Sequence, residues 1–197
     1  MIIHNFEQVS PEWFAIRKGK MTASHAQAIG NAGKGLLTYI NSLMAEFYSS
    51  GKPDQFISID IKRGNELESQ ARSIYELKKG ITVQQVGFIE ADEFSGCSPD
   101  GLISEDGGIE IKCPNDEVYF QYLLEGAEAI DTKYIWQIQM SLLISDRKYF
   151  DFIAYNPNFK ETIFIHRVER DTEKLEKLKI GLAKGAEMIK EIKSKMK

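Results

Sequence analysis

Residues 97–114 constrain the fold of this chain more than any other segment. Two short runs, residues 97–103 and 109–114, are rich in apolar residues, and the polar turn between them contains Gly107 and Gly108. Two such runs around a glycine-containing turn predict a β-hairpin. A hairpin of this kind brings side chains from its two strands together on each face.

Three ionisable side chains are expected to meet on one face of this hairpin. Alternate side chains of a strand share a face, so Glu110 and Lys112 project together. The first strand returns Asp100 beside them. Two carboxylates this close repel each other, and one takes up a proton unless a cation lies between them. A hard divalent cation such as magnesium resolves the conflict through oxygen ligands.

These three residue types are the ones that metal-assisted phosphodiester hydrolysis requires. A metal can lower the pKa of a bound water and stabilise charge that builds on a phosphate. Lys112 can orient the attacking water or help to deprotonate it, and it can balance the phosphate charge. The alternative is a surface hairpin with a plain Glu–Lys pair, which the bare pattern leaves open. Ser-Pro-Asp-Gly before the pattern and Cys-Pro after it favour an active site.

The opposite face of the hairpin is expected to be apolar. Ile109, Ile111 and Cys113 should face the core, and Cys97 and Cys113 should lie opposite each other across the hairpin as buried, apolar thiols. The chain has only these two cysteines and three scattered histidines, which argues against a structural zinc site.

The rest of the chain predicts alternating helices and strands. Helical spacing or helix-start and helix-stop residues mark residues 10–18, 22–30, 36–47, 64–79, 119–125, 132–144 and the C-terminus from Asp171. Strands are expected at residues 83–89, 149–155 and 162–168, and loops at 31–35 and 51–54. We therefore expect an α/β fold with a central mixed sheet flanked by helices. The apolar stripe of the last helix could cover this sheet or form a subunit interface.

Composition sets the remaining limits. The chain has 197 residues, of which 43% are hydrophobic and 27% charged, so we expect one globular domain over residues 1–197. It contains no apolar run near the about 18 residues that a membrane span needs, and no signal peptide, so a cytoplasmic location is expected. The net charge of −4 does not exclude DNA as a substrate, because phosphate contact needs only a local basic surface.

Several ordered motifs resemble one known family. Residues 98–102 and 108–114 are similar to the core of the lambda-exonuclease, or YqaJ-type, phage recombination nucleases, which belong to the PD-(D/E)xK group. Further matches are Trp13-Phe14-Ala15-Ile16-Arg17-Lys18-Gly19 with Met21-Thr22-Ala23-Ser24, Gly64-Asn65-Glu66-Leu67-Glu68, Gln137-Ile138-Gln139-Met140-Ser141 and Tyr155-Asn156-Pro157. The matches follow the family's order from about Trp13 to Arg170, which is most of the chain.

The resemblance implies roles for particular residues. Asp100 and Glu110 would bind metal through their side chains and Ile111 through its carbonyl, while Lys112 would act on the nucleophilic water. Glu68 would assist near the water or near a second metal. The remaining set would bind the 5′-phosphate at a DNA end and consists of Arg17, Ser24, Ser98 and Gln137. Arginine is a permanently charged phosphate donor, and a serine near a helix start adds a hydroxyl beside amides that favour anions.

The residue patterns alone leave alternatives to these roles. Arg17 could be a solvated cation at a helix end. The helix pattern does not choose between Glu66 and Glu68, and Gln139 competes with Gln137. Trp13 fits the core or a helix staple better than a base-stacking platform. His25 fits a structural or surface histidine better than a DNA contact.

In one place the chain departs from the family pattern. The segment between Gly30 and Leu36 is shorter than the basic loop with which the lambda enzyme grips DNA, and Lys34 is its only basic residue. The loop therefore offers a single basic side chain for contact with the downstream duplex.

The sequence thus predicts a metal-dependent 5′-to-3′ exonuclease on linear double-stranded DNA. It would use magnesium, or alternatively manganese, with two ions in the active complex, release mononucleotides, and leave 3′ overhangs for phage recombination. The resemblance further implies a ring-shaped homotrimer and a phage single-strand annealing protein as partner, in the cytoplasm of a bacterial host. The alternatives are a PD-(D/E)xK endonuclease, a RecB-type repair nuclease and a non-catalytic module that binds DNA ends.

Overall fold

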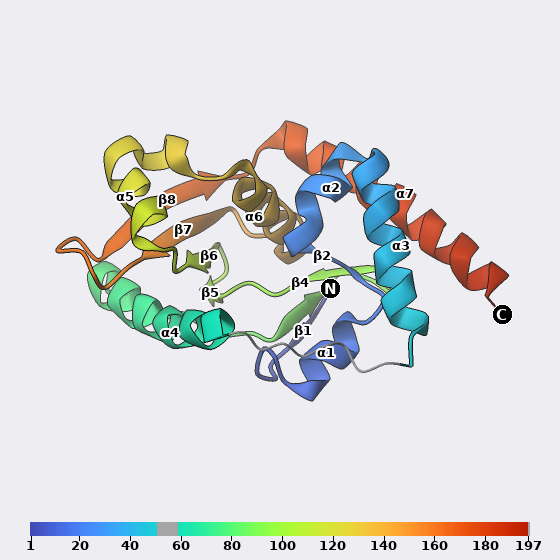
Figure 1. The fold of residues 1–197 in the computed structure, drawn as a ribbon, viewed down its shortest axis with the longest axis horizontal. Helices are drawn as coiled ribbons and strands as arrows, with labels where there is room; N and C mark the ends of the chain where they lie inside the picture. Colours follow the sequence, from blue (N-terminus) through green and yellow to red (C-terminus); the bar gives the residue numbers. More distant parts are fainter. Residues whose placement is uncertain (51–58, 197) are drawn as a thin grey trace.

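The computed structural model of the chain describes residues 1–50 and 59–196, with the side chains of residues 59–66 outside the description. It is an α/β structure in which helices flank two four-stranded mixed sheets (Figure 1). The expectation of an α/β fold is confirmed, but the prediction of one central sheet is wrong. The chain passes from one sheet to the other between residues 97 and 101, inside the segment that we expected to be one hairpin strand.

The first sheet is built largely from the N-terminal half of the chain. Its strand order is β1-β3-β4-β2, and its strands are β1 (Ile2–His4), β3 (Phe88–Glu90), β4 (Ser95–Cys97) and β2 (Met21–Thr22). The helices on the same side of the molecule are α1 (Pro11–Arg17), the 3-10 helix η1 (Ala23–His25), α2 (Ala26–Asn31), α3 (Lys34–Tyr48) and, from the C-terminus, α7 (Thr172–Lys195) (Figure 1). Among the described strands of this sheet, β2 and β4 are the one parallel pair.

The second sheet contains the predicted hairpin. Its order is β5-β6-β7-β8, with β5 (Gly101–Ile103), β6 (Gly107–Lys112), β7 (Tyr149–Tyr155) and β8 (Ile163–Glu169). The helix α4 (Ile59–Lys79) lies on one side of it, and α5 (Asp116–Glu125), the 3-10 helix η2 (Gly126–Ala129) and α6 (Thr132–Ser145) lie on the other (Figure 1). β6 pairs antiparallel with β5 and parallel with β7.

Strand β7 shows how alternation divides the core. Phe150 and Phe152 are fully buried in the larger apolar cluster, which also holds residues of α2, α3, α6 and α7. Ile153 and Tyr155 point to the opposite face and join a smaller cluster with Ala71 and Tyr75 of α4. Successive side chains of a strand point to opposite faces, so both faces of this sheet are covered.

Helix α7 packs against its own chain. Leu175, Leu178 and Ile189 of its predicted apolar stripe are buried, and a Cβ atom at Gly181 would overlap the carbonyl oxygen of Ile29 in α2. Glycine is therefore required where the two helices meet. The stripe contacts α2, α3 and α6 rather than being left open for another subunit.

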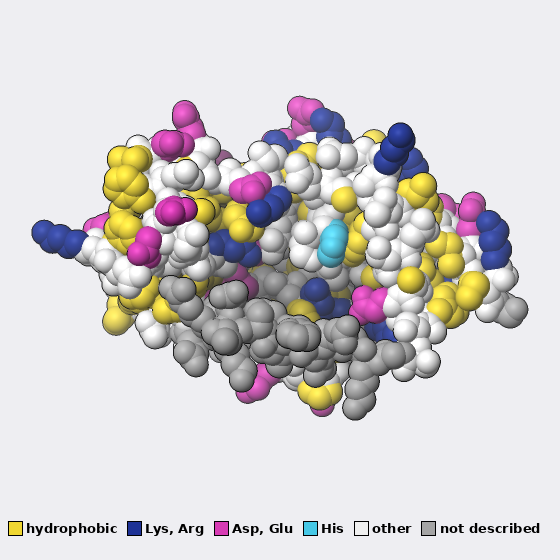
Figure 2. Space-filling model, viewed as in Figure 1, with side chains coloured by type: hydrophobic (Ala, Val, Ile, Leu, Met, Phe, Trp, Pro, Cys, Tyr) yellow, Lys and Arg dark blue, Asp and Glu magenta, His cyan; other side chains and the backbone are white. Residues whose placement is uncertain are grey.

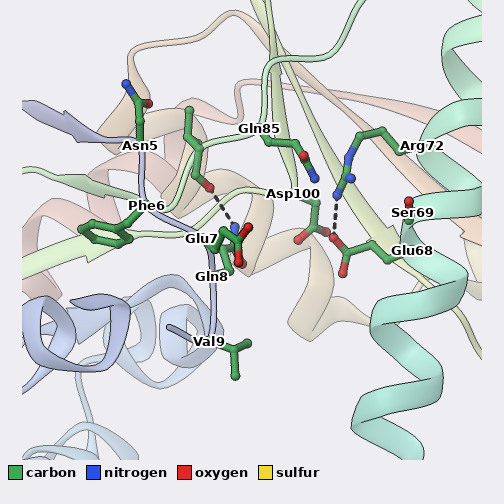
Figure 3. A pocket seen from close by; sticks show the side chains of 11 residues that line it. Asn5, Phe6, Glu7, Gln8, Val9, Glu68, Ser69, Arg72, Gln85 and Asp100 are labelled. Atoms are coloured by element: carbon green, nitrogen blue, oxygen red, sulfur yellow. Dashed lines mark hydrogen bonds and ion pairs between the residues drawn. The ribbon is translucent and has the colours of Figure 1, made fainter. Parts of the chain in front are cut away.

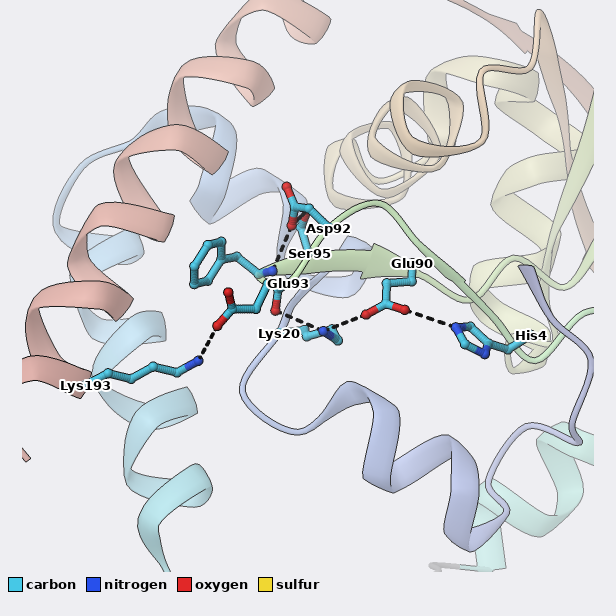
Figure 4. Close-up of polar contacts among 8 residues, drawn as sticks. His4, Lys20, Glu90, Asp92, Glu93, Ser95 and Lys193 are labelled. Carbon is cyan, nitrogen blue, oxygen red and sulfur yellow. Dashed lines mark hydrogen bonds and ion pairs between the residues drawn. The ribbon is translucent and has the colours of Figure 1, made fainter. Parts of the chain in front are cut away.

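Charged side chains join the edges of the first sheet to α7 (Figure 4). The Lys20 ammonium contacts a Glu90 carboxylate oxygen and donates to the Glu93 carbonyl oxygen, both at 2.9 Å. The other Glu90 carboxylate oxygen lies 3.2 Å from His4 Nε2, and Lys193 of α7 reaches the Glu93 carboxylate at 3.1 Å. This network fixes β1 against β3 and thereby fixes the start of the segment that leads to α1.

Most predicted elements are confirmed, with shifted ends. Ser10 caps α1 by accepting from the Trp13 N–H at 3.2 Å, and Gly19 ends the segment at a φ of +78°. Helices α3, α4 and α5 each begin earlier than expected. The strand predicted at residues 83–89 is mostly an irregular segment, and only its last residues, 88 and 89, belong to β3. The loop predicted at residues 51–54 lies outside the described residues.

Cys97 is buried as predicted, but the prediction that the two cysteines lie opposite each other across the hairpin is wrong. Cys97 is in β4 of the first sheet and is buried in the larger cluster, whereas Cys113 follows β6 and packs against the smaller cluster. They do not face each other, because the chain leaves the first sheet directly after Cys97. No helix in the described part of the chain is long and apolar enough to cross a membrane.

Candidate active site

The predicted carboxylates and lysine meet at the start and end of the β5–β6 hairpin. Asp100 directly precedes β5, while Glu110 and Lys112 lie on one face of β6. The neighbouring Ile109 and Ile111 point to the opposite face and are buried against α4 residues. The predicted alternation along this strand is therefore confirmed, and it places a carboxylate, Glu110, at 1% exposure inside the protein.

Glu110 receives two short hydrogen bonds on one oxygen and none on the other. Its Oε1 accepts from Lys112 Nζ and from Gln137 Nε2, both at 2.6 Å. Its Oε2 is buried and has no partner among the described residues. A buried polar atom without a partner destabilises the fold, and a bound cation or hydrogen-bond donor at this oxygen would remove that cost.

The main chain holds Asp100 in place. Asp100 Oδ2 accepts a hydrogen bond from the Ile111 N–H at 2.6 Å, so the carboxylate is fixed against the strand that carries Glu110. This contact also places the main chain of Ile111 beside the carboxylates, which is where its predicted role as a carbonyl ligand requires it to be.

Glu68 of α4 approaches the same site from a third direction. Its carboxylate forms an ion pair with Arg72, one helical turn later, at 2.8 Å. Both side chains line a cavity of about 440 Å³ together with Asp100 and Gln85 (Figure 3). The Gln85 amide oxygen accepts from the Arg72 guanidinium. The side chain of Glu66, the competitor of Glu68, lies outside the described residues.

The charges in this site oppose one another. Burial is the main cause that raises the pKa of Glu110 to about 7, with Asp100 and Glu68 adding to it against the lowering effect of Lys112. Burial also raises the pKa of Glu68 to about 7, helped by Asp100, and burial raises the pKa of Asp100. Burial lowers the pKa of Lys112, but Glu110 and Asp100 outweigh it, so the net shift is upward and the ammonium form is favoured.

These observations fit a divalent cation. A buried carboxylate and a partly buried one, both with raised pKa values, and a buried oxygen that has no partner among the described residues are what a hard cation would satisfy. Among the described residues, no three His, Cys, Asp or Glu side chains close into a cage by themselves.

The N-terminal arm, residues 5–9, forms the opposite wall of this cavity (Figure 3). Gln8 Nε2 donates to the carbonyl oxygens of Val86 at 3.0 Å and of Pro99 at 2.9 Å. The next residue, Val9, has a φ of +65°, which is an unfavourable conformation for a β-branched residue. Sequence reasoning missed Gln8, because its partners are 78 and 91 positions away and no local pattern signals them.

Helix α1 contacts Ser98, the residue before the Pro99 that Gln8 contacts. The Ser98 hydroxyl oxygen accepts from Trp13 Nε1 at 2.9 Å and from Arg17 Nη1 at 3.1 Å. The Arg17 guanidinium lies 3.9 Å from the centre of the Trp13 ring. Trp13 is thus a partly buried hydrogen-bond donor as well as a packing residue, which its sequence pattern did not indicate.

Arg17 is a cation without a charged partner in the described part of the chain. It forms no ion pair with a described carboxylate, although Glu46 lines the same cavity and its charge favours the charged guanidinium; burial is the larger effect and lowers the pKa of Arg17. It lines a cavity of about 310 Å³ with His25 and Tyr39. Figure 2 shows a recess on this face of the molecule, bordered by both basic and acidic side chains. A partly buried guanidinium whose hydrogen-bond partner is a neutral hydroxyl is suited to binding an anion.

The remaining predicted residues divide between these two regions. Ser24 lies in η1, where its hydroxyl is 3.1 Å from Thr22 Oγ1 and 3.2 Å from His25 Nδ1. The structure therefore places Ser24 beside a residue of the Arg17 cavity, without a direct bond to Arg17. Gln137 contacts Glu110 rather than Arg17.

The structure separates the two glutamines of α6. Gln139 is 1% exposed, donates to the Glu169 carbonyl oxygen at 2.7 Å and accepts from the Asp171 N–H at 2.9 Å. It fixes the turn from β8 into α7. Gln137 is on the side of α6 that faces the carboxylates, so it is the glutamine that belongs to the site.

Comparisons with known proteins agree with this arrangement. The family described as the YqaJ-like viral recombinase domain matches residues 12–148. The solved structure of the alkaline exonuclease LHK-Exo from Laribacter hongkongensis is 31% identical, with 95% of this chain and 98% of that chain covered and a TM-score of 0.80. A complex of LHK-Exo with dAMP matches at 30% identity, with the same coverage of both chains, 95% and 98%, and a TM-score of 0.82.

A more distant structure supports the fold alone. The phage-related exonuclease from Haemophilus somnus is 18% identical, with 90% of this chain and 96% of that chain covered and a TM-score of 0.62. No curated protein sequence matches the chain.

Proposed function

Because the chain belongs to the YqaJ-like viral recombinase family, we propose that it is a magnesium-dependent 5′-to-3′ exonuclease on linear double-stranded DNA. The observation that carries the proposal is the segment Ser98-Pro99-Asp100. At one end its serine contacts Arg17, a cation that lacks a charged partner among the described residues, and at the other end its aspartate joins the buried carboxylates. One short piece of chain thus links an anion site to a hydrolytic site.

The carboxylates would hold the metal. Asp100, Glu110 and the Ile111 carbonyl are the proposed ligands, and Glu68 would serve a second ion or the attacking water. Magnesium fits the oxygen donors, manganese is the alternative, and we propose two ions in the active complex. When bound, the metal would lower the pKa of a water molecule and stabilise charge on the scissile phosphate.

Lys112 would act as a cation in this site. Its ammonium group is held 2.6 Å from Glu110, and the raised pKa keeps it protonated. A protonated lysine can orient the nucleophilic water and neutralise negative charge on the phosphate. Gln137, which shares the same Glu110 oxygen, would position that carboxylate or turn toward the phosphate when DNA binds.

The Arg17 region would recognise the end of the DNA. A 5′-terminal phosphate would supply the anion that the Arg17 guanidinium lacks among the described residues, with hydroxyl donors from Ser98 and Ser24. Charge-assisted hydrogen bonds of this kind are stronger than neutral ones, so a phosphorylated end would bind better than a hydroxyl end. This requirement would direct cutting to 5′ ends.

The finer features of the proposal follow from the family. We propose that residues 1–197 form one nuclease domain in the PD-(D/E)xK arrangement, in which three copies make a ring around DNA. The enzyme would release mononucleotides, leave 3′ overhangs and work with a phage single-strand annealing protein in a bacterial cytoplasm. The dAMP complex of LHK-Exo supports a mononucleotide product.

Each alternative activity would need only part of this arrangement. A PD-(D/E)xK endonuclease or RecB-type nuclease would not need Arg17 and Ser98 arranged for an end phosphate. A non-catalytic end-binding module would not need Asp100, Glu110 and Lys112 together. The combination of both sites favours the exonuclease.

A single set of reactions distinguishes these activities. The protein is incubated with magnesium and either a linear duplex, with or without a 5′-phosphate, or a closed circle. We expect phosphorylated linear DNA to be degraded faster than hydroxyl-ended linear DNA, with no cutting of the circle, no reaction in EDTA and no reaction with Asp100→Ala. Cutting of the circle would favour the endonuclease, and binding without degradation would favour the non-catalytic module.

A further inference from the structure

His25 and Tyr39 form a pair of stacked rings at the edge of the Arg17 cavity. Their centroids are 4.0 Å apart, and the ring planes differ by 8°. Tyr39 is 9% exposed, and its hydroxyl accepts from the Thr22 N–H at 3.0 Å, so the Tyr39 ring is fixed in the core. His25 lies at the junction of η1 and α2 and is exposed. One ring of the stack is therefore anchored and the other has an open face.

The position of His25 is set by its neighbours on each side. Its Nδ1 lies 3.2 Å from the Ser24 hydroxyl, and Nε2 has no protein partner among the described residues. The ring borders the same cavity as Arg17 and Trp13. Burial, followed by the charge of Arg17, lowers the pKa of His25, so the imidazole is neutral at neutral pH.

This arrangement differs from that of a structural histidine. A histidine that only stabilises the fold would be buried or would use both ring nitrogens. Here one face of the His25 ring stacks on Tyr39. The other face and Nε2 have no ring or hydrogen-bond partner among the described residues, and the ring lies at the edge of the cavity that Arg17 also lines. An open aromatic face next to a phosphate site has the chemistry of a nucleobase platform.

We propose that the outer face of His25 stacks against the base of the 5′-terminal nucleotide. The inference rests on the proposed function, because it takes the phosphate of that nucleotide to be bound by Arg17 and its serine partners. One sugar joins a base to its 5′-phosphate, so a base whose phosphate lies in the cavity must lie near the cavity edge. Every base has a π-face, so the contact would accept all four bases, with stronger stacking for purines.

A binding cycle isolates this contact. The dissociation constant is measured by fluorescence anisotropy for labelled, 5′-phosphorylated duplexes whose terminal nucleotide is either normal or an abasic analogue. The proteins carry Asp100→Asn to prevent cutting, with His25 either intact or changed to Ala. We expect loss of the base to weaken binding by roughly tenfold when His25 is present. With His25→Ala the two DNAs should bind equally, both at the weakened level.

A second variant separates stacking from folding. His25→Phe keeps a flat ring and should restore the difference between the normal and abasic ends, and the thermal unfolding midpoint of His25→Ala should show that it is folded. An abasic penalty of the same size in His25→Ala would overturn the inference, and so would its absence when His25 is intact.

The cycle also distinguishes this inference from the function on which it rests. If phosphorylated and hydroxyl ends bind equally while the His25 cycle behaves as expected, the phosphate site fails and the platform stands. If the phosphate preference is present in both proteins and the cycle shows no coupling, the platform fails and the phosphate site stands.

Discussion

The Arg17 guanidinium donates a hydrogen bond to the Ser98 hydroxyl oxygen at 3.1 Å, and Ser98 lies two positions before Asp100 in the sequence. Helix α1 therefore holds the segment that carries Asp100, one of the proposed metal ligands. Gln8 grips the carbonyl oxygen of Pro99 in the same segment at 2.9 Å. The two proposed sites are linked through consecutive residues, so their separation is fixed by short contacts rather than by the overall fold.

Arg17→Ala should abolish the preference for phosphorylated 5′ ends. Removing one charge-assisted interaction costs about 1.5–3 kcal/mol, or roughly 10- to 150-fold in kcat/KM on phosphorylated DNA. Activity on hydroxyl ends should change little, because Trp13 still donates to Ser98 and Gln8 still donates to Pro99, which keeps the segment before Asp100 in place. Arg17→Lys keeps the charge but not the forked geometry and should recover only part of the preference. An unchanged ratio of the two rates in Arg17→Ala would contradict the phosphate site.

The two glutamines of α6 should behave in opposite ways. Gln139→Ala leaves the Glu169 carbonyl and the Asp171 N–H without their partner in a buried place, so unfolding free energy should fall by about 1–3 kcal/mol. Gln137→Ala should leave stability nearly unchanged and reduce kcat. Chemical denaturation and steady-state kinetics on both variants check this, and a loss of stability in Gln137→Ala with full activity would show the assignment to be wrong.

Gln8→Ala should impair catalysis through Asp100. The change removes hydrogen bonds to Val86 and Pro99, so the main chain before Asp100 is held less firmly. We expect kcat to fall by about tenfold with little change in KM, since hydrogen bonds are worth about 0.5–1.5 kcal/mol each. An unaltered kcat in a folded Gln8→Ala protein would contradict a positioning role.

Val9→Gly is the matched control for the N-terminal arm. Glycine adopts a positive φ without the steric cost that Val9 bears, so the variant should be more stable by about 1 kcal/mol. Gln8 keeps its contacts in this variant, and kcat should therefore stay near the wild-type value. A fall in both stability and kcat would mean that the valine side chain itself is needed.

Metal-free protein should lose stability as pH rises. The pKa of Glu110 is raised from 4.5 to about 7 by burial, so between these values the folded state holds a proton that the unfolded chain has released. More protons bound in the folded state mean that stability falls with increasing pH through this window, by on the order of 2 kcal/mol. Thermal unfolding in EDTA from pH 5 to pH 8 measures the effect.

Magnesium and Glu110→Gln provide the controls for this titration. Magnesium should raise the unfolding midpoint more at pH 8 than at pH 5, because it binds the ionised carboxylates. Glu110→Gln cannot titrate and should show a flatter profile in EDTA, with the remaining slope due to Asp100 and Glu68. Identical profiles for the two proteins would contradict the account of the buried charges.

The hairpin could be predicted because its signals are local. Alternation placed Glu110 and Lys112 on one face, and the glycine turn brought Asp100 to the same place. The split of residues 97–103 between two sheets could not be predicted in this way, because the run reads as one strand and the pairing partners of β4 lie far away in sequence. The wrong prediction for Cys97 follows from the same cause.

The site was predictable only where residue types and resemblance agreed. The resemblance favoured Gln137, and the structure gives a physical reason, because Gln139 is used inside the fold. Gln8 and the platform face of His25 depend on contacts between distant segments, and neither has a local pattern. The contact of Gln137 with Glu110 was also unexpected, since the resemblance implied a phosphate contact instead.

The most direct test of the proposed activity follows the two ends of one strand. A linear duplex carries a different radioactive label on the 5′ and 3′ nucleotides of the same strand, and both labels are followed during a single turnover with magnesium. A 5′-to-3′ exonuclease should release the 5′ label first, as a mononucleotide, while the 3′ label stays in long DNA. Release of the 3′ label first, or of both labels together in oligonucleotides, would contradict a 5′-to-3′ exonuclease.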